Sequence, residues 1–469
     1  MKEESGNRAE HLSHRLDFYP LLDALIERRS RRFGKGMRLN GGPLTHTSTW
    51  TAAPLALEEE AALAFAACGI TGYALAELPY ETGDMPDAGS GNIMTHFFGR
   101  TVASGDAMHY VILFVLNDEG VWMLRRPQDY PRAEIPALIQ AARDHRLVEL
   151  YEKSRVRIAG RRLDVPCEVP FVAPFNKWAA NRPGTTYFLP VNEFTAIYIN
   201  VLLSALSEEF GFFIVDERRR FQPAGIGAFA RSRGGHLYDD PRASRLATIA
   251  FLETWLYEFA AIEQGGMLQN LGLMTQALGL GGFPHFAAHP FIWPQTLGFR
   301  MEAIPFSRTI GAGPVGKAVL NAAGKDHPVP TAVGLEVDGE VLIKPFCPPY
   351  YRNMEQAVLA FIDYKYAEGR GTFRDGGAAT GWRDGAAVQD GIPAYSEKVI
   401  AATIAYCEYV YRRYGRFPAS SGPFRTILAY QAHHLDLDFY GRFYHPDVLS
   451  QTQRQHDVNW HASPPPHPA

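Results

Sequence analysis

A chain of 469 residues with 46% hydrophobic and 20% charged residues has the composition of an ordinary globular protein, which excludes an intrinsically disordered one. Its formal net charge is -4, so no global basic field favours nucleic acid or an anionic membrane as a partner. No apolar stretch reaches membrane-spanning length, and the four widely separated cysteines lack the spacing of a disulfide framework or a compact zinc site. We therefore expect a cytoplasmic protein without nucleic-acid or membrane partners.

The first predicted element is a short helix over residues 21–26 that ends in a basic cluster. Pro20 suits its first position, and Leu21, Leu22, Leu25 and Ile26 keep the 3-to-4 spacing of a face that can be buried. Residues 28–32 then read Arg-Arg-Ser-Arg-Arg. Guanidinium groups supply paired donors that match a phosphate, and a serine hydroxyl adds one hydrogen bond. The cluster predicts either an anion site or a solvated helix end favoured by the helix dipole.

Hydrophobic periodicity and turn residues place the elements of the first half of the chain. In order, we expect a helix over 58–68 ended by Gly69, a glycine-rich loop over 83–91, a buried hairpin of 109–116 and 121–124, a helix over 133–150 followed by irregular chain to 183, a helix over 194–210 and a strand over 212–215.

The most regular segment begins at Leu246. Residues 246–264 predict a long helix, Gly265 and Gly266 interrupt it, and residues 267–278 predict a second buried helix that ends at Gly279. A loop over 279–284 follows. Its glycines let the backbone approach something flat, or they only cap the helix and turn the chain.

Further elements complete the pattern. We expect a hairpin of 331–337 and 341–345 around an Asp-Gly turn, a helix over 354–366, a surface loop over 369–394 and a disordered tail.

Three motifs in this order resemble the nitroreductase superfamily. Residues 28–33 resemble its N-terminal RxSxR motif, and residues 269–281 resemble its central helix and the following loop. Residues 100–105 resemble the RxxPSxG element of the branch that contains azoline-type dehydrogenases, although Ala103 replaces the proline. The resemblance covers about 15–124 and 246–345.

The resemblance implies an α+β fold, with a nitroreductase-like mixed sheet flanked by helices, a large middle insertion and a C-terminal helical extension. An FMN-binding domain would span 15–345, with the insertion at about 125–245. The extension would span 346–460, and the disordered tail 461–469.

It also implies a homodimer with FMN at the subunit interface. Arg28, Arg29 and Arg32 would bind the phosphate with help from Ser30, and Arg100 and Ser104 would reach the phosphate or the ring edge. Gly281, Gly282, Pro284 and His285 would lie against the flavin near N5. Alternatively, Arg100 pairs with a carboxylate and Ser104 only begins a turn.

The implied function is FMN-dependent transfer of hydride between flavin N5 and a small organic substrate, with NAD(P)H as one electron donor. The cofactor supplies the redox chemistry, so no side chain is assigned a catalytic role. The direction of hydride transfer stays open, and the two long additional segments suggest a dedicated biosynthetic substrate. The alternative is a catalytically inactive flavin-binding or partner-binding scaffold with the same fold.

Other candidate chemistry is weaker. Residues 311–317 fit part of a phosphate-binding loop, but Ala318 replaces the hydroxyl residue that would hold Mg²⁺, so we reject a nucleotide site. Cys347 could act as an acid or base, although a rigid turn that packs aromatic residues is the simpler interpretation. A last group could ligate a metal, but a hydrogen-bonded structural cluster is favoured over it: His433, His434, Asp436, Asp438 and His445.

Overall fold

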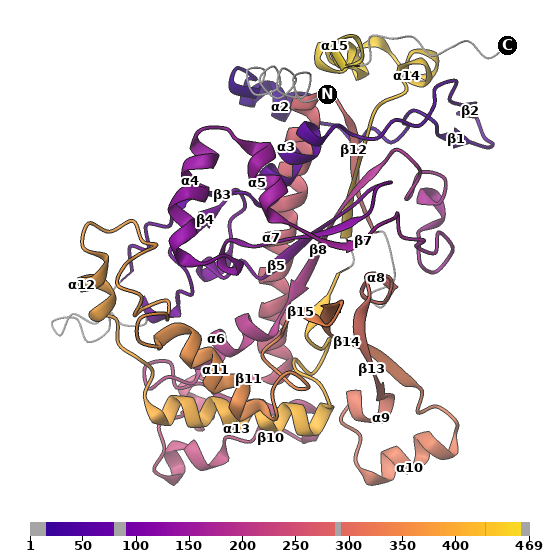
Figure 1. Ribbon diagram of the computed structural model, residues 1–469. Helices are drawn as coiled ribbons and strands as arrows, with labels where there is room; N and C mark the ends of the chain where they lie inside the picture. The colour runs from indigo at the N-terminus through magenta and orange to yellow at the C-terminus, as the bar shows by residue number, and fades with distance from the viewer. Residues whose placement is uncertain (1–15, 79–90, 287–291, 427, 461–469) are drawn as a thin grey trace.

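The computed structural model describes residues 16–78, 91–286, 292–426 and 428–460 as a mixed α and β chain (Figure 1). Its helices are α2 (Leu21–Glu27), α3 (Leu57–Cys68), α4 (Ile135–Arg143), α5 (Leu147–Ser154), α6 (Thr195–Ala205), α7 (Ile249–Leu278), α8 (Ile292–Thr296), α9 (Phe306–Thr309), α10 (Pro314–Ala322), α11 (Met354–Tyr366), α12 (Gly385–Asp390), α13 (Glu397–Tyr414), α14 (Leu437–Phe443) and α15 (Gln451–Trp460). Its strands are β1 (Arg38–Leu39), β2 (His46–Thr47), β3 (Ile70–Tyr73), β4 (Phe98–Arg100), β5 (Val111–Leu116), β6 (Val121–Leu124), β7 (Arg155–Ala159), β8 (Thr186–Glu193), β9 (Phe213–Asp216), β10 (Gln222–Pro223), β11 (Leu246–Thr248), β12 (Gly281–Phe286), β13 (Phe299–Pro305), β14 (Pro328–Val337), β15 (Glu340–Ile343), β16 (Phe424–Arg425) and β17 (Leu428–His433). The expected combination of helices and sheet is confirmed at this level.

A seven-stranded sheet organises the chain. Its strands follow the order β12-β17-β8-β5-β6-β7, and β16 pairs with β8. Every one of these pairings is antiparallel. Two inner strands come from unexpected places, since β8 lies within the expected insertion and β17 within the expected extension. Both segments therefore contribute strands to the main sheet.

The two faces of the sheet carry different apolar layers. Along β5, Phe114 faces a core shared with Trp293 of α8 and with strands β13 to β15, while its neighbour Val115 faces a core shared with α3, α5 and α7. This is the alternation that a strand produces when both faces are buried. Figure 1 shows α3 and α5 on one side of the sheet and β13, with α8, on the other. The predicted buried hairpin is confirmed as β5 and β6.

The long helix α7 corrects one prediction. The expected break at Gly265 and Gly266 is absent, because the helix continues through both residues to Leu278. Its buried residues keep a spacing of three to four across the glycines, so continuing the helix keeps one unbroken buried stripe. A Cβ at Gly266 would lie 2.7 Å from Val102 Cγ2, so this glycine allows close packing rather than a break. The predicted helical start at Leu246 is instead the strand β11.

A second core lies away from the sheet. It joins the first half of α7 to α6, α11 and α13. The helix expected over 354–366 is confirmed as α11. The stretch over 369–394 is more ordered than a surface loop, because it contains α12 and fully buries Phe373 and Ile392.

Several smaller predictions are resolved. The helix expected over 58–68 is α3, and the Asp338-Gly339 turn joins β14 to β15 with φ of 51° and 83°. The helix expected over 133–150 is split into α4 and α5, and strand β7 was not predicted. Most of the loop expected over 83–91, and the tail, lie outside the described residues. Within the described parts of the chain, no helix combines the length and apolar character needed to cross a membrane.

Candidate functional site

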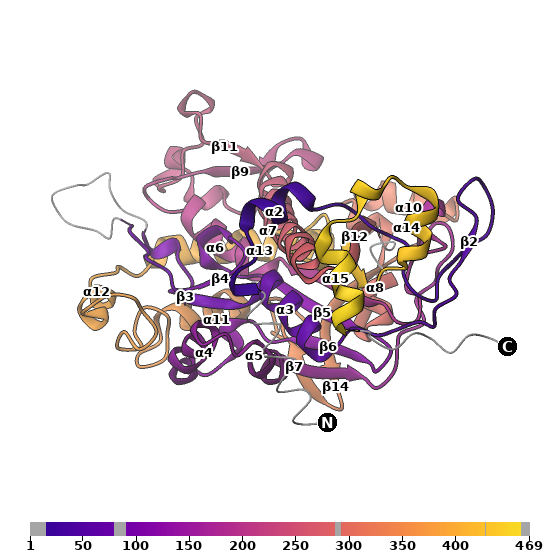
Figure 2. The same ribbon diagram turned by 90° about the horizontal axis from the view of Figure 1, so that it is seen from above.

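The basic cluster follows a helix whose apolar side chains face outward. In α2 only Ala24 is buried, whereas Leu21, Leu22, Leu25 and Ile26 are 51 to 69% exposed. The prediction that this apolar face is buried is therefore wrong for the single chain. Figure 2 shows α2 and α15 each beside α7. The seven-residue helix rests on α7 and leaves its larger side chains in solvent.

Arg31 fixes the basic turn to the protein. Its guanidinium is buried and donates to the Val448 carbonyl at 2.8 and 3.1 Å and to Gln276 Oε1 at 3.0 Å. Its backbone N–H donates to the Gly282 carbonyl at 3.2 Å, which ties the turn to the start of β12. Burial lowers the pKa of Arg31, although the group stays cationic at neutral pH because its ordinary pKa is above 12. Arg31 is thus a structural anchor.

The three preceding residues present their side chains to solvent. Arg29 pairs with Glu27 at 3.5 Å, and Ser30 is exposed. Arg28 is half-buried against α7, where a Cβ added at Gly272 would lie 3.2 Å from its Cδ atom. Among the described residues its guanidinium has no hydrogen-bond or ion-pair partner. These residues form an exposed cationic turn, defined as Arg28, Arg29 and Ser30, that can accept an anion.

Arg32 points to the other side of the turn. It donates to Asn176 Oδ1 at 2.8 Å, and its guanidinium carbon lies 4.8 Å from the centre of the Phe283 ring. His285 packs on the same phenyl ring at 4.9 Å between centroids. Burial, and then the charge of Arg32, lower the pKa of His285 to about 4, so this imidazole is neutral at pH 7. Neither of its ring nitrogens has a hydrogen-bond partner among the described residues.

The predicted loop over 279–284 is a helix cap followed by a strand. Gly279 ends α7 with φ of 79°, and β12 begins at Gly281 and pairs with β17. A Cβ at Gly281 would lie 2.8 Å from His433 Nε2, and a Cβ at Gly282 would lie 2.6 Å from the Tyr430 hydroxyl. Packing against this chain's own side chains therefore accounts for both glycines.

Arg100 and Ser104 belong to a separate buried network. Arg100 Nη1 lies 3.5 Å from Glu263 Oε1, and the Ser104 hydroxyl donates to Glu263 Oε2 at 2.7 Å. The alternative pairing of Arg100 with a carboxylate is thus found. Glu263 precedes the end of α7 by fifteen residues, which corresponds to about 22 Å along the helix. The structure does not bring Arg100 and Ser104 to the start of β12.

The fit of these residues to a flavin is partial. Within the exposed cationic turn, Arg28 has unpaired guanidinium donors of the kind that a phosphate needs, whereas Arg29 is held by Glu27. Pro284 is exposed, and the buried His285 nearby has unsatisfied ring nitrogens. Arg32 is already bound to Asn176, and Arg100 and Ser104 are bound to Glu263. A phosphate therefore fits at the cationic turn and not at Arg100.

The histidines and aspartates singled out near the C-terminus do not form one group. Asp436 caps α14, accepting from Phe439 N at 3.2 Å, and Asp438 accepts from Trp50 Nε1 at 3.1 Å. His445 is exposed. His433 is buried beside Phe283, and burial lowers its pKa to about 3.

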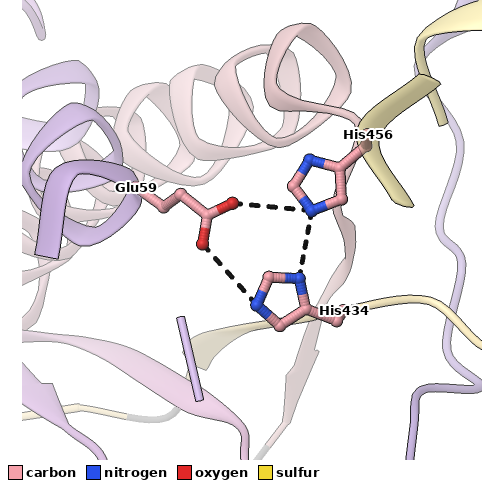
Figure 3. A group of neighbouring side chains, drawn as sticks. All are labelled: Glu59, His434 and His456. Atoms are coloured by element: carbon pink, nitrogen blue, oxygen red, sulfur yellow. Dashed lines mark hydrogen bonds and ion pairs between the residues drawn. The ribbon is translucent and has the colours of Figure 1, made fainter. Parts of the chain in front are cut away.

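His434 instead meets two residues that the sequence did not connect with it. Its Nδ1 lies 3.0 Å from His456 Nε2, and its Nε2 lies 3.6 Å from Glu59 Oε2 (Figure 3). Glu59 lies at the start of the helix expected over 58–68, and His456 is far away in sequence. No spacing rule could have joined three residues from such separate segments.

Cys347 is not a reactive group. Its thiol is 1% exposed, and burial raises its pKa well above the ordinary value, so the thiolate is absent at neutral pH. The interpretation as a packed turn residue fits this position.

A pocket of about 560 Å³ was not foreseen from the sequence. It is lined by three arginines, Arg218, Arg416 and Arg425, and by apolar residues that include Met301 and Phe424. None of the predicted cofactor residues lines it.

Comparisons with known proteins add little to this geometry. No protein-family model matches the chain, and no curated protein matches it. Among solved structures, it is similar to a candidate nitroreductase from Ralstonia eutropha JMP134, with 12% identity and a TM-score of 0.27 over 60% of this chain and 75% of that chain. A similarity at this level supports no argument about fold or activity.

Proposed function

We propose that this chain is an FMN-dependent oxidoreductase that transfers hydride between flavin N5 and a small organic substrate. The observation that carries the proposal is the exposed cationic turn, which offers a phosphate two guanidinium groups and a hydroxyl at a position fixed by Arg31. It occupies the place of the RxSxR motif, ahead of α7 and β12 in the chain. Nothing else within the described residues satisfies Arg28.

Each part of the turn has a definite task in this proposal. Arg28 and Arg29 neutralise and orient the phosphate, and Ser30 donates one hydrogen bond. His285 is neutral because it is buried, so it can donate or accept one hydrogen bond beside β12 without adding a charge. The bound flavin would supply the hydride chemistry.

A homodimer is part of the proposal. The apolar residues of α2 are exposed, and on α7 Phe259 and Ile262 are 37 and 65% exposed. Exposed apolar residues of this size on neighbouring helices favour contact with another protein surface. A second copy placed there would enclose the cationic turn and exclude water from an FMN bound beside it.

The test is FMN affinity in a double variant, Arg28→Ala with Arg29→Ala. Hydrogen bonds to charged groups contribute about 1.5–3 kcal/mol each, so losing two arginines weakens binding by about 100-fold or more. Arg242→Ala is the control, since this arginine's side chain is 90% exposed at another site. Unchanged FMN affinity in a folded double variant would place the phosphate elsewhere.

One observation favours the alternative of an inactive scaffold. Tyr430 and His433 pack directly against the glycines of β12. These glycines therefore do not need a bound flavin to explain them. Bound flavin that neither NADH nor NADPH reduces, and that no candidate substrate reoxidises, would favour the scaffold.

The proposed substrate is a dedicated biosynthetic compound rather than any electron acceptor. The length and aromatic content of the middle and C-terminal segments support a narrow specificity. Rapid turnover of simple nitroaromatics and quinones with NADPH would contradict it. Whether the enzyme oxidises or reduces its substrate is decided by the same assay run in both directions.

A further inference from the structure

Three buried side chains from distant segments meet beside the C-terminal helix. Glu59 comes from the first turn of α3, His434 directly follows β17, and His456 comes from α15. The three are 1, 2 and 3% exposed. Figure 3 shows all three side chains pointing toward a common point between the elements. One ligand atom from each lies within 4.8 Å of the others.

The carboxylate is oriented by its own helix. Glu59 Oε2 accepts the N–H of Ala56 at 2.8 Å, as in a capping box. The start of the helix also favours the negative charge. The other oxygen, Oε1, is turned toward His456 Nε2 at 3.5 Å. The carboxylate is thereby directed at the two imidazoles.

The environment of His434 fixes which ring nitrogen can ligate. Its Nε2 lies 3.1 Å from the Pro54 carbonyl, which can only accept, so Nε2 carries the proton in the neutral ring. The lone pair is then on Nδ1, the atom that faces His456. A ligating histidine held by a backbone carbonyl through its other nitrogen is the usual arrangement around protein metals.

Two of the three separations among these ligand atoms suit a tetrahedral ion. Bonds of about 2.0–2.1 Å at a tetrahedral angle separate two ligand atoms by about 3.3–3.4 Å. The observed separations are 3.0 Å for His434 Nδ1 to His456 Nε2 and 3.5 Å for His456 Nε2 to Glu59 Oε1. Small movements of either ring would therefore accommodate an ion.

We propose that Glu59 Oε1, His434 Nδ1 and His456 Nε2 bind a divalent transition-metal ion, with Zn²⁺ the best match to two imidazoles and a carboxylate. In this form His456 carries its proton on Nδ1. Three ligands from the described residues fill three of the four positions of a tetrahedral ion. The ion fixes α15 and the end of β17 to the start of α3. The segment just before α15 carries the carbonyl that accepts hydrogen bonds from Arg31. The site is independent of the proposed flavin chemistry.

The competing arrangement needs no metal. The His456 Nε2–H would donate to His434 Nδ1 at the same 3.0 Å, and the carboxylate would balance a protonated imidazole. A direct binding experiment separates the two arrangements, because only one of them takes up an ion.

The experiment uses the full chain, purified without a histidine tag, treated with EDTA and dialysed. It is titrated with Co²⁺ as a spectroscopic probe and then with Zn²⁺ as a competitor. We expect one Co²⁺ per chain, visible bands of a tetrahedral site, and displacement by one equivalent of Zn²⁺. His445→Gln, which changes an exposed histidine, should bind like the wild type.

His434→Gln and His456→Gln should each lose the visible bands and weaken metal binding by at least 10-fold, since each removes one ligand. Glu59→Gln keeps an acceptor for Ala56 and tests the carboxylate alone. Circular dichroism establishes that each variant is folded. Wild-type binding in folded His434→Gln and His456→Gln would overturn the proposal. If both fail to fold, the wild-type titration decides, and absence of bound Co²⁺ and Zn²⁺ overturns it.

Discussion

The burial of the His285 imidazole predicts how the free energy of unfolding depends on pH. Its pKa is lowered from 6.5 to about 4 in the folded chain, so between these values the unfolded chain binds a proton that the folded chain does not. The contribution of this group to the free energy of unfolding is fully present above pH 6.5 and is lost as the pH falls toward 4. At pH 5, the loss relative to pH 7.5 is about 2 kcal/mol.

The variant His285→Phe removes this titration and keeps an aromatic ring against Phe283 and Tyr187. It also removes two buried ring nitrogens that have no hydrogen-bond partner among the described residues. We expect the free energy of unfolding of the wild type to fall by about 2 kcal/mol more than that of the variant between pH 7.5 and pH 5.

The assay is urea denaturation at both pH values, because all other titrating groups are common to the two proteins and cancel in the difference. His445→Gln serves as a control, since a solvent-exposed imidazole is hydrated in both states. An equal pH dependence in the wild type and His285→Phe would show that His285 is not buried in neutral form.

Other predictions follow from packing and burial. Gly282→Ala should lower the free energy of unfolding by about 1–3 kcal/mol in urea denaturation. Gly441→Ala should not, because an added Cβ there meets nothing within 4 Å. Equal stability of the two variants would contradict the described packing. Glu263→Gln should cost about 3–5 kcal/mol because Arg100 stays buried without its anion, and no loss would show that the pair is solvated. Iodoacetamide should leave Cys347 unmodified in the native protein and modify it in urea, as followed by peptide mass mapping; rapid native labelling would contradict its burial.

The sequence predicted local elements well where periodicity and turn residues agreed. Helix α11 and the Asp338-Gly339 hairpin followed directly from these patterns. The break at Gly265 was wrong because a weak local preference for ending a helix is outweighed by the continuous buried stripe of α7. Local composition carries no information about such long-range packing.

The candidate site was predicted less completely, for a related reason. The motif located the basic turn, but the sequence does not reveal that Arg31 is buried while Arg29 is exposed. Arg100 looked like an anion ligand until the structure placed Glu263 beside it. The meeting of Glu59 and His434 depends on the position of β17 in the sheet, which no local pattern encodes.

FMN binding by this chain can be tested with the visible absorption spectrum of the purified protein, with any heat-released cofactor identified by mass. We expect flavin bands and released FMN, or uptake of added FMN by a protein that was purified without it. A colourless protein that fails to bind added FMN would contradict the proposed function and leave the cationic turn as a site for a different anion.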